Sequence, residues 1–358
     1  MTTITVYAPG HYDYADSYGL IACQLVRHLS RLGVRVNAVG LGRTVMESQP
    51  PDVRAVTEQP IQPSFGGVVL GYPTGYAYQS QLLFLGPRVA LAMFESSRIP
   101  SAWVEPLNDC DAVIVPSTFC RDVFQACGVT APVHVVPLGV SEAYKPAPRD
   151  TDGRPLTFLA FMDRGARKGG VVALQAFLRA FGDSMDYRLI LKTRTPKVPL
   201  QLTNANVEVV QRDMTEQELC ELYQRADVLV NPHKGEGYGM IPREAAACGC
   251  ITLTTAWSGT VDDLDQWGWP LPYTLERADW KGARIFDGLD LGEWAAPDVD
   301  GVANVLRDVA ANVGRYRAQA QANAENVRRL YSWPAFAAQV LDIWEGVAIG
   351  NRIGMAAA

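Results

Sequence analysis

The sequence has few of the features that mark exported, membrane-spanning or metal-bound proteins. Its seven cysteines are scattered, and the closest pair, Cys248 and Cys250, lacks the spacing of a zinc site, so we expect reduced thiols. No segment approaches the roughly 18 consecutive apolar residues of a membrane span. No basic region precedes an apolar stretch near the first residue, which argues against a signal peptide. We therefore expect a cytoplasmic protein without an integral membrane segment.

The sequence also lacks an excess of basic residues. It holds 32 Lys and Arg against 38 Asp and Glu, a net charge of -6, which argues against a nucleic acid or an anionic membrane as the main partner. With 48% hydrophobic and 20% charged residues, the composition is that of a folded globular protein. A chain of 358 residues is too long for one ordinary core and suits two domains of about 150 residues each with an appendage.

Short apolar segments rich in β-branched residues predict buried parallel strands in the first half of the chain. They cover residues 4–8, 34–39, 67–70, 89–93, 112–115 and 133–136. One helical pattern between them ends at Gly33 and has its leucines near one face, at Leu20, Leu25, Leu29 and Leu32. Another helical pattern covers residues 119–127. The alternation predicts a doubly wound domain over residues 1–145, in which ligands bind at the carboxyl ends of the strands.

The second half repeats this alternation after a linker near residues 140–150. The expected strands cover residues 156–160, 228–230 and 251–254, the expected helices cover residues 171–181 and 299–330, and a tryptophan-rich, loop-like stretch runs to residue 298. A last helix, from Pro334, carries an apolar stripe made of Phe336, Val340, Ile343, Trp344 and Val347. We expect a second doubly wound domain over residues 146–332 and a C-terminal helix over residues 333–358, whose stripe fits ordinary packing or dimerisation.

Residues 231–249 hold the strongest functional pattern in the chain. They cross a glycine-rich turn after an expected strand and enter an alanine-rich helix, with Pro242 suited to its first turn and Gly249 to its end. Gly237 and Gly239 leave the backbone open to a ligand. The first amides of the helix favour an anion such as a diphosphate.

Two carboxylates, Glu236 and Glu244, flank this turn with seven residues between them. Carboxylates are good acceptors for the paired hydroxyls of sugars. A glycine loop before a helix is common in α/β proteins, so the pattern by itself also fits a purely structural role. Read for function, the segment fits a ligand that contains both a sugar and a phosphate.

The segment that begins at Glu236 resembles the Glu, seven residues, Glu signature of the retaining GT-B glycosyltransferases of the group 1 (family 4) type. Residues 214–230 resemble the helix and strand that lead into that signature, and residues 136–140 with 144–146 resemble the interdomain linker of the family. The resemblance covers most of residues 90–345. It implies an α/β GT-B fold, in which two Rossmann-like domains face a cleft and the C-terminal helix crosses back to the first domain.

The resemblance also implies roles for single residues. Glu244 would bind the ribose hydroxyls of a nucleotide sugar, and Glu236 the hydroxyls of the donor sugar. Backbone amides at Gly237 and Gly239, together with Lys168, would hold the diphosphate. The donor-binding residues implied on this segment are Glu244, Gly237, Tyr238, Gly239 and Met240.

A basic loop, residues 163–170, opens the expected helix at 171–181 and can meet a diphosphate with positive charge. Lys168 matches the lysine of the family, whereas Met162 stands where the family has an arginine. That departure leaves nearby basic residues to supply the second charge, unless the loop is simply solvated. The candidates are Arg164, Arg167, Lys192 and Arg194.

Two candidate groups lie in the first half. The loop after the first expected strand is aromatic and polar, and it either lines the acceptor or is an ordinary solvated loop. Its acceptor-side candidates are Gly10, His11, Tyr12 and Tyr14. Glu95 follows the fourth expected strand, near the place where many relatives have a histidine that faces the donor sugar. We treat Glu95 as a catalytic candidate, with an ion pair to Arg98 or a helix cap as the structural alternative.

The resemblance predicts a glycosyltransferase that moves a hexosyl or related group from a nucleoside diphosphate sugar to a hydroxyl, with retention. We expect no cofactor and no metal, because basic residues and a helix end can stabilise the diphosphate, and we interpret Asp262 and Asp263 as surface or capping residues. One alternative is a protein that binds the nucleotide sugar without transfer, or an epimerase. Another is transfer to hydroxymethylated pyrimidines of phage DNA. Glycan, lipid, protein and modified DNA base all remain open as acceptors.

Overall fold

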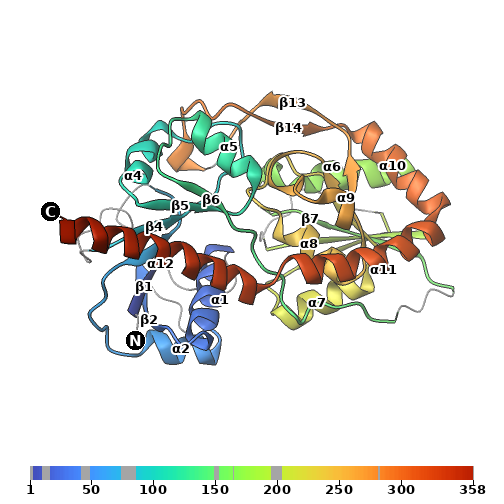
Figure 1. Ribbon diagram of the computed structural model, residues 1–358. Coiled ribbons are helices and arrows are strands. Elements are labelled where there is room, and N and C mark those ends of the chain that lie inside the picture. Colours follow the sequence, from blue (N-terminus) through green and yellow to red (C-terminus); the bar gives the residue numbers. More distant parts are fainter. Residues whose placement is uncertain are drawn as a thin grey trace. The chain divides into compact units, whose positions relative to one another are not determined.

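The computed structural model describes residues 3–9, 17–41, 49–73, 86–148, 153–163, 165–194, 204–280 and 283–357 (Figure 1). The chain divides into two compact units. The first comprises Met1–Phe94, Arg98–Gly139 and Tyr331–Ala358, and the second comprises Glu95–Ser97 and Val140–Leu330. The sequence order did not suggest that Glu95–Ser97 belongs with the second unit. Among the described residues, no helix is long and apolar enough to cross a membrane.

A parallel sheet of six strands, in the order β2-β1-β3-β4-β5-β6, forms the centre of the first unit. The strands are β1 (Thr3–Pro9), β2 (Arg35–Leu41), β3 (Gly67–Leu70), β4 (Arg88–Leu91), β5 (Ala112–Val115) and β6 (Val133–Val135). Every side chain of β3 and β5 is buried, which explains why these strands read as continuous apolar runs. All six strands predicted in the first half are confirmed, with small differences at their ends.

The helices of the first unit are α1 (Ser17–Arg31), α2 (Pro51–Thr57), η3 (Ser101–Trp103), α4 (Val104–Asn108), α5 (Thr118–Ala126) and α12 (Trp333–Ala357). Leu25 and Leu29 of α1 are buried, as expected. Leu32 lies beyond the end of α1 and is 50% exposed, so the predicted apolar face is wrong at this residue. Gly33 has a φ of +81°, a left-handed conformation that glycine adopts at little cost and that ends the helix.

Helix α12 packs along α1 and against β5 within the first unit. Its side chains Phe336, Val340 and Trp344 are buried, which confirms the predicted return of the last helix to the first sheet. The start of α12 packs directly against the backbone at Gly139, where a Cβ atom would lie 2.2 Å from the backbone nitrogen of Trp333.

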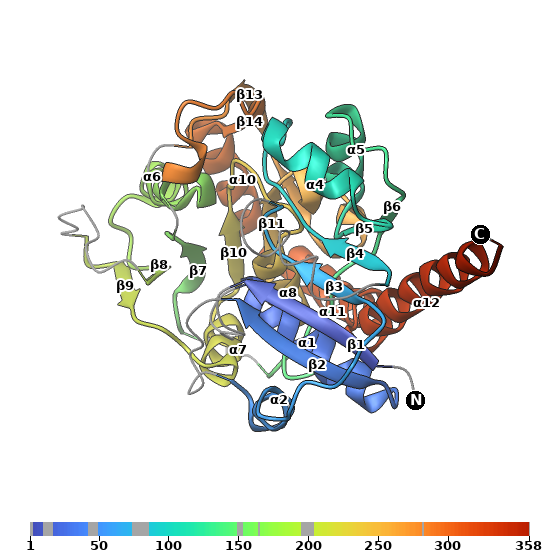
Figure 2. The ribbon, with the colours of Figure 1, turned by 90° about the vertical axis from the view of Figure 1, so that its left-hand side faces the viewer.

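The second unit has its own parallel sheet, in the order β12-β11-β10-β7-β8-β9, which can be followed from β9 to β11 in Figure 2. Its strands are β7 (Leu156–Phe161), β8 (Tyr187–Thr193), β9 (Val207–Gln211), β10 (Val228–Asn231), β11 (Ile251–Thr255) and β12 (Trp269–Leu271). The chain starts at β7, builds outward to β9, and then returns to the other side of β7 with β10. The order therefore reverses between β7 and β10, and doubly wound sheets bind ligands at the carboxyl ends of such strands.

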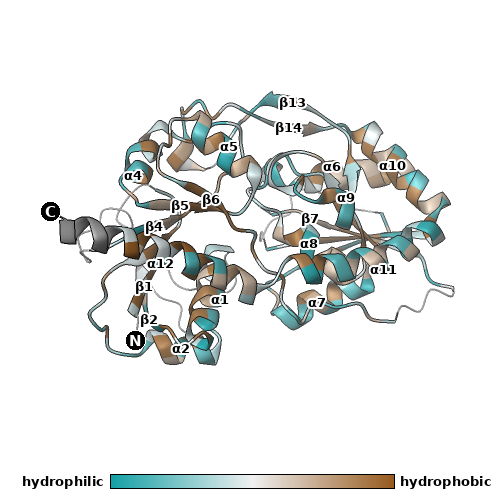
Figure 3. Ribbon diagram, viewed as in Figure 1, coloured by the Kyte–Doolittle hydropathy of each residue, from teal (hydrophilic) through white to brown (hydrophobic). Residues whose placement is uncertain are grey.

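The helices of the second unit are η4 (Gly165–Lys168), α6 (Gly170–Phe181), α7 (Glu216–Arg225), α8 (Met240–Ala247), η5 (Ser258–Thr260), α9 (Leu264–Trp267), η6 (Arg284–Phe286), α10 (Val299–Ala311) and α11 (Val313–Leu330). The core joins apolar side chains of the sheet, such as Phe158 and Val228, to Phe177 of α6 and Leu306 of α10. Figure 3 shows this pattern as brown strands between helices with teal outer faces. The helical structure predicted over residues 299–330 is confirmed, with Asn312 separating α10 from α11.

A β-hairpin replaces part of the loop-like stretch that was expected before residue 298. Strands β13 (Tyr273–Arg277) and β14 (Glu293–Pro297) pair in antiparallel fashion, and the prediction of a loop is wrong there. The hairpin is tied to the loop after β10, because Ala295 N donates to the carbonyl oxygen of Lys234 over 2.8 Å. Lys234 also forms an ion pair with Glu276, and the indole of Trp294 donates to the same carboxylate over 2.9 Å.

The buried stripe of α12 predicts a large loss of stability when it is truncated. We expect Phe336→Ala to lower the free energy of unfolding by about 3 to 5 kcal/mol, because a fully buried ring is replaced by a cavity. Ile349→Ala on the same helix is the matched control: its side chain is 59% exposed, so the change should stay within about 0.5 kcal/mol. Equal losses in urea titrations of the two variants would contradict the packing described for α12.

Candidate active site

The candidate site lies where the loops after β7, β10 and β11 meet beside residues 95–97. Glycines make this meeting possible, because their backbones touch other backbones directly. A Cβ atom on Gly169 would lie 1.9 Å from the carbonyl oxygen of Pro232, and one on Gly235 would lie 1.8 Å from that of Glu95. Gly169 also has a φ of +72°, which other residues rarely adopt. Larger residues at these positions would push the loops apart.

The loop after β11 supports the loop after β10 from the other side. Ser258 accepts a hydrogen bond at its hydroxyl from Glu236 N over 3.0 Å, and Gly259 N donates to the carbonyl oxygen of Glu236 over 2.8 Å. Thr260 Oγ1 lies 3.1 Å from Nε2 of His233. Burial lowers the pKa of His233 to about 4, so its ring is neutral and serves as a hydrogen-bonding partner of the loop. The backbone of Glu236 is therefore fixed by neighbours on both its amide and its carbonyl.

A buried arginine braces the start of α8. The guanidinium of Arg243 donates to the carbonyl oxygens of Tyr238, Gly239, Gly259 and Asp262. Its Cζ also lies 3.9 Å from the ring centroid of Tyr238. Gly239 precedes α8 with a φ of +85° and no side chain to cap the helix. The hydrogen bonds of Arg243 thus fix the turn before α8. The first turn of α8 has no side-chain cap hydrogen bond.

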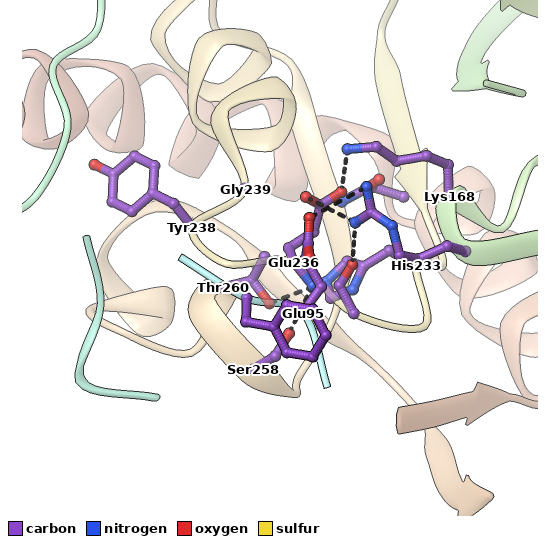
Figure 4. A network of polar contacts seen from close by, with 12 residues as sticks. Glu95, Lys168, His233, Glu236, Tyr238, Gly239, Ser258 and Thr260 are labelled. Atoms are coloured by element: carbon purple, nitrogen blue, oxygen red, sulfur yellow. Dashed lines mark hydrogen bonds and ion pairs between the residues drawn. The ribbon is translucent and has the colours of Figure 1, made fainter. Parts of the chain in front are cut away.

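Four charged side chains form a compact cluster in this unit (Figure 4). Lys168 Nζ lies 2.5 Å from Oε1 of Glu236. Arg167 Nη1 donates to the carbonyl oxygen of Gly235 over 2.6 Å and lies 3.6 Å from Oε2 of Glu236. The other guanidinium nitrogen of Arg167 is 3.5 Å from Oε1 of Glu95. Two positive and two negative charges therefore balance within the cluster.

The cluster keeps Glu236 ionised. Burial by itself would raise the pKa of this carboxyl, but the positive charges of Lys168 and Arg167 outweigh it and hold the pKa to about 2. Glu236 is consequently a carboxylate, and an acceptor of hydrogen bonds, at every pH near neutrality.

Glu244 behaves in the opposite way. It projects from α8, is buried, and accepts a hydrogen bond at Oε2 from the hydroxyl of Tyr223 over 2.9 Å. Burial raises its pKa to about 7, and neither the Tyr223 hydrogen bond nor the charge of Lys168 cancels that effect. The carboxyl therefore changes protonation state close to neutral pH.

The other basic candidates occupy different surroundings. Lys192 is buried at the end of β8, where burial lowers its pKa and Nζ donates to the carbonyl oxygen of Thr193 over 3.3 Å. Arg194 is exposed and bonds to Asp163 through its backbone amide, over 2.6 Å, and through Nε, over 3.4 Å. Arg164 lies outside the described residues.

The remaining predicted site residues divide into two groups. Tyr238 is buried, and Figure 4 shows its hydroxyl directed away from the cluster, while Met240 begins α8 and is half-buried. Asp263 directly precedes α9 with a φ of +54°. Among the described residues, no three His, Cys, Asp or Glu side chains gather as a metal site. The acceptor-side candidates Gly10, His11, Tyr12 and Tyr14 lie outside the described residues.

The sequence analysis missed the residues that support the loops of the site but do not belong to its charged cluster. Arg243 was read only as part of a helix, although an arginine in an alanine-rich buried helix is itself a signal that it has partners. Ser258 and Thr260 follow the strand next to β10, so the rule that ligands bind at carboxyl ends could have included them. The centroid of the Trp280 ring lies 5.8 Å from Cζ of Arg167, and nothing in the sequence around Trp280 indicated this contact.

Known structures match this architecture over the full chain. A sucrose-phosphate synthase from Thermosynechococcus elongatus superposes with a TM-score of 0.70 at 16% identity and covers 100% of both chains. A glycosyltransferase from Rickettsia africae gives a TM-score of 0.72 at 13% identity, covering 97% of this chain and 98% of the other. Anabaena HepE, determined with UDP and glucose, gives 0.66 at 12% identity, covering 96% and 100%. The protein has the GT-B fold.

A family model matches part of the second unit. Residues 154–269 match the model described as "Glycosyl transferases group 1". The matched segment contains Lys168, Glu236 and Glu244.

Two curated relatives match parts of the chain. The phosphatidylinositol N-acetylglucosaminyltransferase gpi3 subunit of Schizosaccharomyces pombe is 21% identical over 257 residues, 69% of this chain. A D-inositol 3-phosphate glycosyltransferase of Xylanimonas cellulosilytica is 30% identical over 126 residues, 35% of this chain. The alignments span 51% of the first relative and 25% of the second.

The raised pKa of Glu244 predicts a cost in stability at alkaline pH. A carboxyl with an ordinary pKa of 4.5 when unfolded and about 7 when folded holds its proton more tightly in the folded state, so stability falls as pH rises from 4.5 to 7. Glu244→Gln removes this cost, and we expect the variant to be more stable than the wild type by up to about 3 kcal/mol at pH 8 but not at pH 4.5. The exposed Glu325→Gln on α11 serves as control, and a pH-independent difference for Glu244→Gln would contradict the assignment.

Proposed function

We propose that this protein is a glycosyltransferase that moves a sugar from a nucleoside diphosphate sugar to a hydroxyl group. The observation that carries the proposal is the Lys168, Arg167 and Glu236 cluster beside the uncapped start of α8. These groups lie at the switch point of a GT-B sheet, inside the segment that matches the group 1 family model. This is where a doubly wound domain binds a nucleotide.

In the proposed complex, the diphosphate lies at the start of α8 and contacts Lys168. Helix N-termini favour negative charge because their first amides have no partner within the helix. Glu244, farther along the same helix, accepts hydrogen bonds from the ribose hydroxyls. Glu236 accepts them from the hydroxyls of the donor sugar.

The charge balance of the cluster suggests that the diphosphate of the donor binds before its sugar. Before the donor arrives, Lys168 is paired with Glu236. A diphosphate competes for the ammonium group of Lys168, and Glu236 then turns its freed oxygens to the donor sugar. Arg167 remains close to Glu236 and keeps that carboxylate ionised during the exchange. Binding of the diphosphate therefore frees Glu236 to bind the donor sugar.

The proposed reaction breaks the bond between the anomeric carbon and the diphosphate oxygen. Positive charge develops on the sugar ring while negative charge develops on the leaving diphosphate. Lys168 and the α8 amides are preorganised to stabilise that negative charge, which is the larger contribution expected of the protein. The acceptor oxygen bonds to the anomeric carbon and gives up its proton. Retention of configuration is our proposal from the resemblance to group 1 enzymes.

The acceptor is the open part of the proposal. The names of both relatives contain an inositol, as phosphatidylinositol in one and D-inositol 3-phosphate in the other. Inositol and its phosphate are therefore the first acceptors to test, followed by glycans, lipids, proteins and hydroxymethylated DNA.

The proposal is tested first by donor binding and then by product analysis. Thermal shifts with UDP-, GDP- and ADP-sugars should identify a donor that raises the melting temperature, and mass spectrometry should then detect transfer in excess EDTA. Glu244→Ala should weaken donor binding, and Glu236→Gln should lower turnover, each by about 1.5 to 3 kcal/mol, or roughly 10- to 100-fold. A donor that binds without any transferred product would favour a binding protein, and an isomerised sugar would favour an epimerase.

Glu95 has a separate test, because its carboxylate lies 3.5 Å from the guanidinium of Arg167, a partner that the sequence did not suggest. We propose that its charge steadies the cluster during turnover. Glu95→Gln keeps the shape and most of the hydrogen bonding, so kcat should fall about tenfold while the melting temperature stays unchanged. Glu105→Gln on α4 is a control from the first unit. A lowered melting temperature with full turnover per folded molecule would show that Glu95 is only structural.

A further inference from the structure

Tyr223 is the hydrogen-bonding partner of Glu244 on the neighbouring helix. Its hydroxyl donates to Oε2 of Glu244 over 2.9 Å. Tyr223 lies on α7, the helix that precedes α8 in the chain, and its side chain is fully buried. The contact therefore joins two helices at the residue to which the proposed function gives ribose recognition.

The Tyr223 ring is held on several sides. It lies 5.8 Å from the ring of Tyr144 in an edge arrangement and 6.1 Å from the ring of Phe161 at the end of β7. Its backbone is held as well, because Cys250 Sγ donates to the carbonyl oxygen of Tyr223 over 3.0 Å. These contacts fix the position of the phenol oxygen, from which the hydroxyl donates to Glu244.

This geometry gives the two oxygens of the Glu244 carboxylate different partners. A carboxylate has two oxygens, each able to accept two hydrogen bonds. When Tyr223 occupies one site on Oε2, the rotation of the carboxylate is fixed, and Oε1 is left to accept from a ligand hydroxyl. Fixing a recognition group before binding lowers the entropy cost of binding.

We propose that Tyr223 is a positioning residue, which orients the Glu244 carboxylate for the ribose of the donor. The inference rests on the proposed function and deepens it by adding a residue outside the Glu, seven residues, Glu signature. It also assigns a role to the segment of α7 that precedes β10, which the family resemblance included without giving it one.

The alternative is that Tyr223 only fills space between α7 and α8. Tyr223→Phe separates the two possibilities, because it keeps the ring and removes the hydroxyl. A space-filling ring predicts no change in donor binding. A positioning hydroxyl predicts weaker binding and a changed dependence on pH.

The pH dependence follows from the charges around Glu244. The Tyr223 hydroxyl stabilises the ionised carboxyl, Lys168 of η4 does the same, and Glu216 of α7 opposes it. Cys248, which follows α8, has its own pKa raised by burial and stays a neutral thiol. Removing the hydroxyl should therefore raise the pKa of Glu244, so that the variant needs a higher pH than the wild type to bind the donor.

The experiment measures the Kd of the nucleoside diphosphate sugar found by thermal shift, at pH 6, 7 and 8.5, by titration calorimetry. Such sugars are preferable to free nucleoside diphosphates, whose terminal phosphate titrates in the same range. We expect Tyr223→Phe to weaken binding about tenfold at pH 7 and to lose less affinity at pH 8.5. Tyr316→Phe is the matched control, since its hydroxyl also donates to a carboxylate, Asp308, over 2.6 Å but far along the chain on α11.

A double-mutant cycle completes the test. In a Glu244→Ala background, the further change Tyr223→Phe should have no effect on the Kd, because the hydroxyl then has no carboxylate to orient. Equal losses with and without Glu244, or an unchanged Kd and pH profile in Tyr223→Phe, would overturn the inference while leaving the proposed function intact. If no nucleotide sugar binds to the wild type, the proposed function fails instead, and with it the basis for this role of Tyr223.

Discussion

The site depends on the close approach of backbones that only glycine allows. Gly169 lets the loop after β7 touch Pro232 in the loop after β10, and Gly235 lets that loop touch the carbonyl group of Glu95. These contacts bring Lys168 to within 2.5 Å of Glu236 although the residues are 68 positions apart in the chain. Charges that attract one another over a few ångströms lose most of that attraction when they are separated and hydrated. The glycines therefore determine the electrostatics of the site.

The two carboxylates of the signature show how one loop and one helix create different chemical environments. Glu236 lies against two cations, which hold its pKa to about 2, whereas burial raises the pKa of the equally buried Glu244 to about 7. The first is a permanent acceptor. The second is stable in its charged form only with help from Tyr223 and Lys168. Such a residue costs stability in the empty protein, and functional sites commonly carry costs of this kind.

Much of the fold could be predicted because buried parallel strands leave a strong apolar signal, as at residues 67–70 and 112–115. The hairpin of β13 and β14 could not, because β13 holds no fully buried side chain and β14 is buried only in part, so neither strand gives a continuous apolar run. The loops after β7 and β10 could be singled out from the sequence because they follow strand ends, and the structure brings Lys168 and Glu236 of these loops to within 2.5 Å. The partners of Arg243 could not be predicted, because they come from two loops that α8 and β11 separate in the sequence.

Glu95 and Met162 are the two positions at which the sequence departs from the pattern that its resemblance to the group 1 enzymes implies. In the structure Arg167, five residues after Met162, lies 3.5 Å from Glu95. A buried carboxylate without a cation, or a buried guanidinium without an anion, would each be costly. In this structure the charge of Glu95 is instead matched by Arg167 of the basic loop that also carries Lys168. Considered from the sequence alone, Glu95 and Met162 suggest a weakened site; the ion pair shows that the added negative charge has a cation beside it.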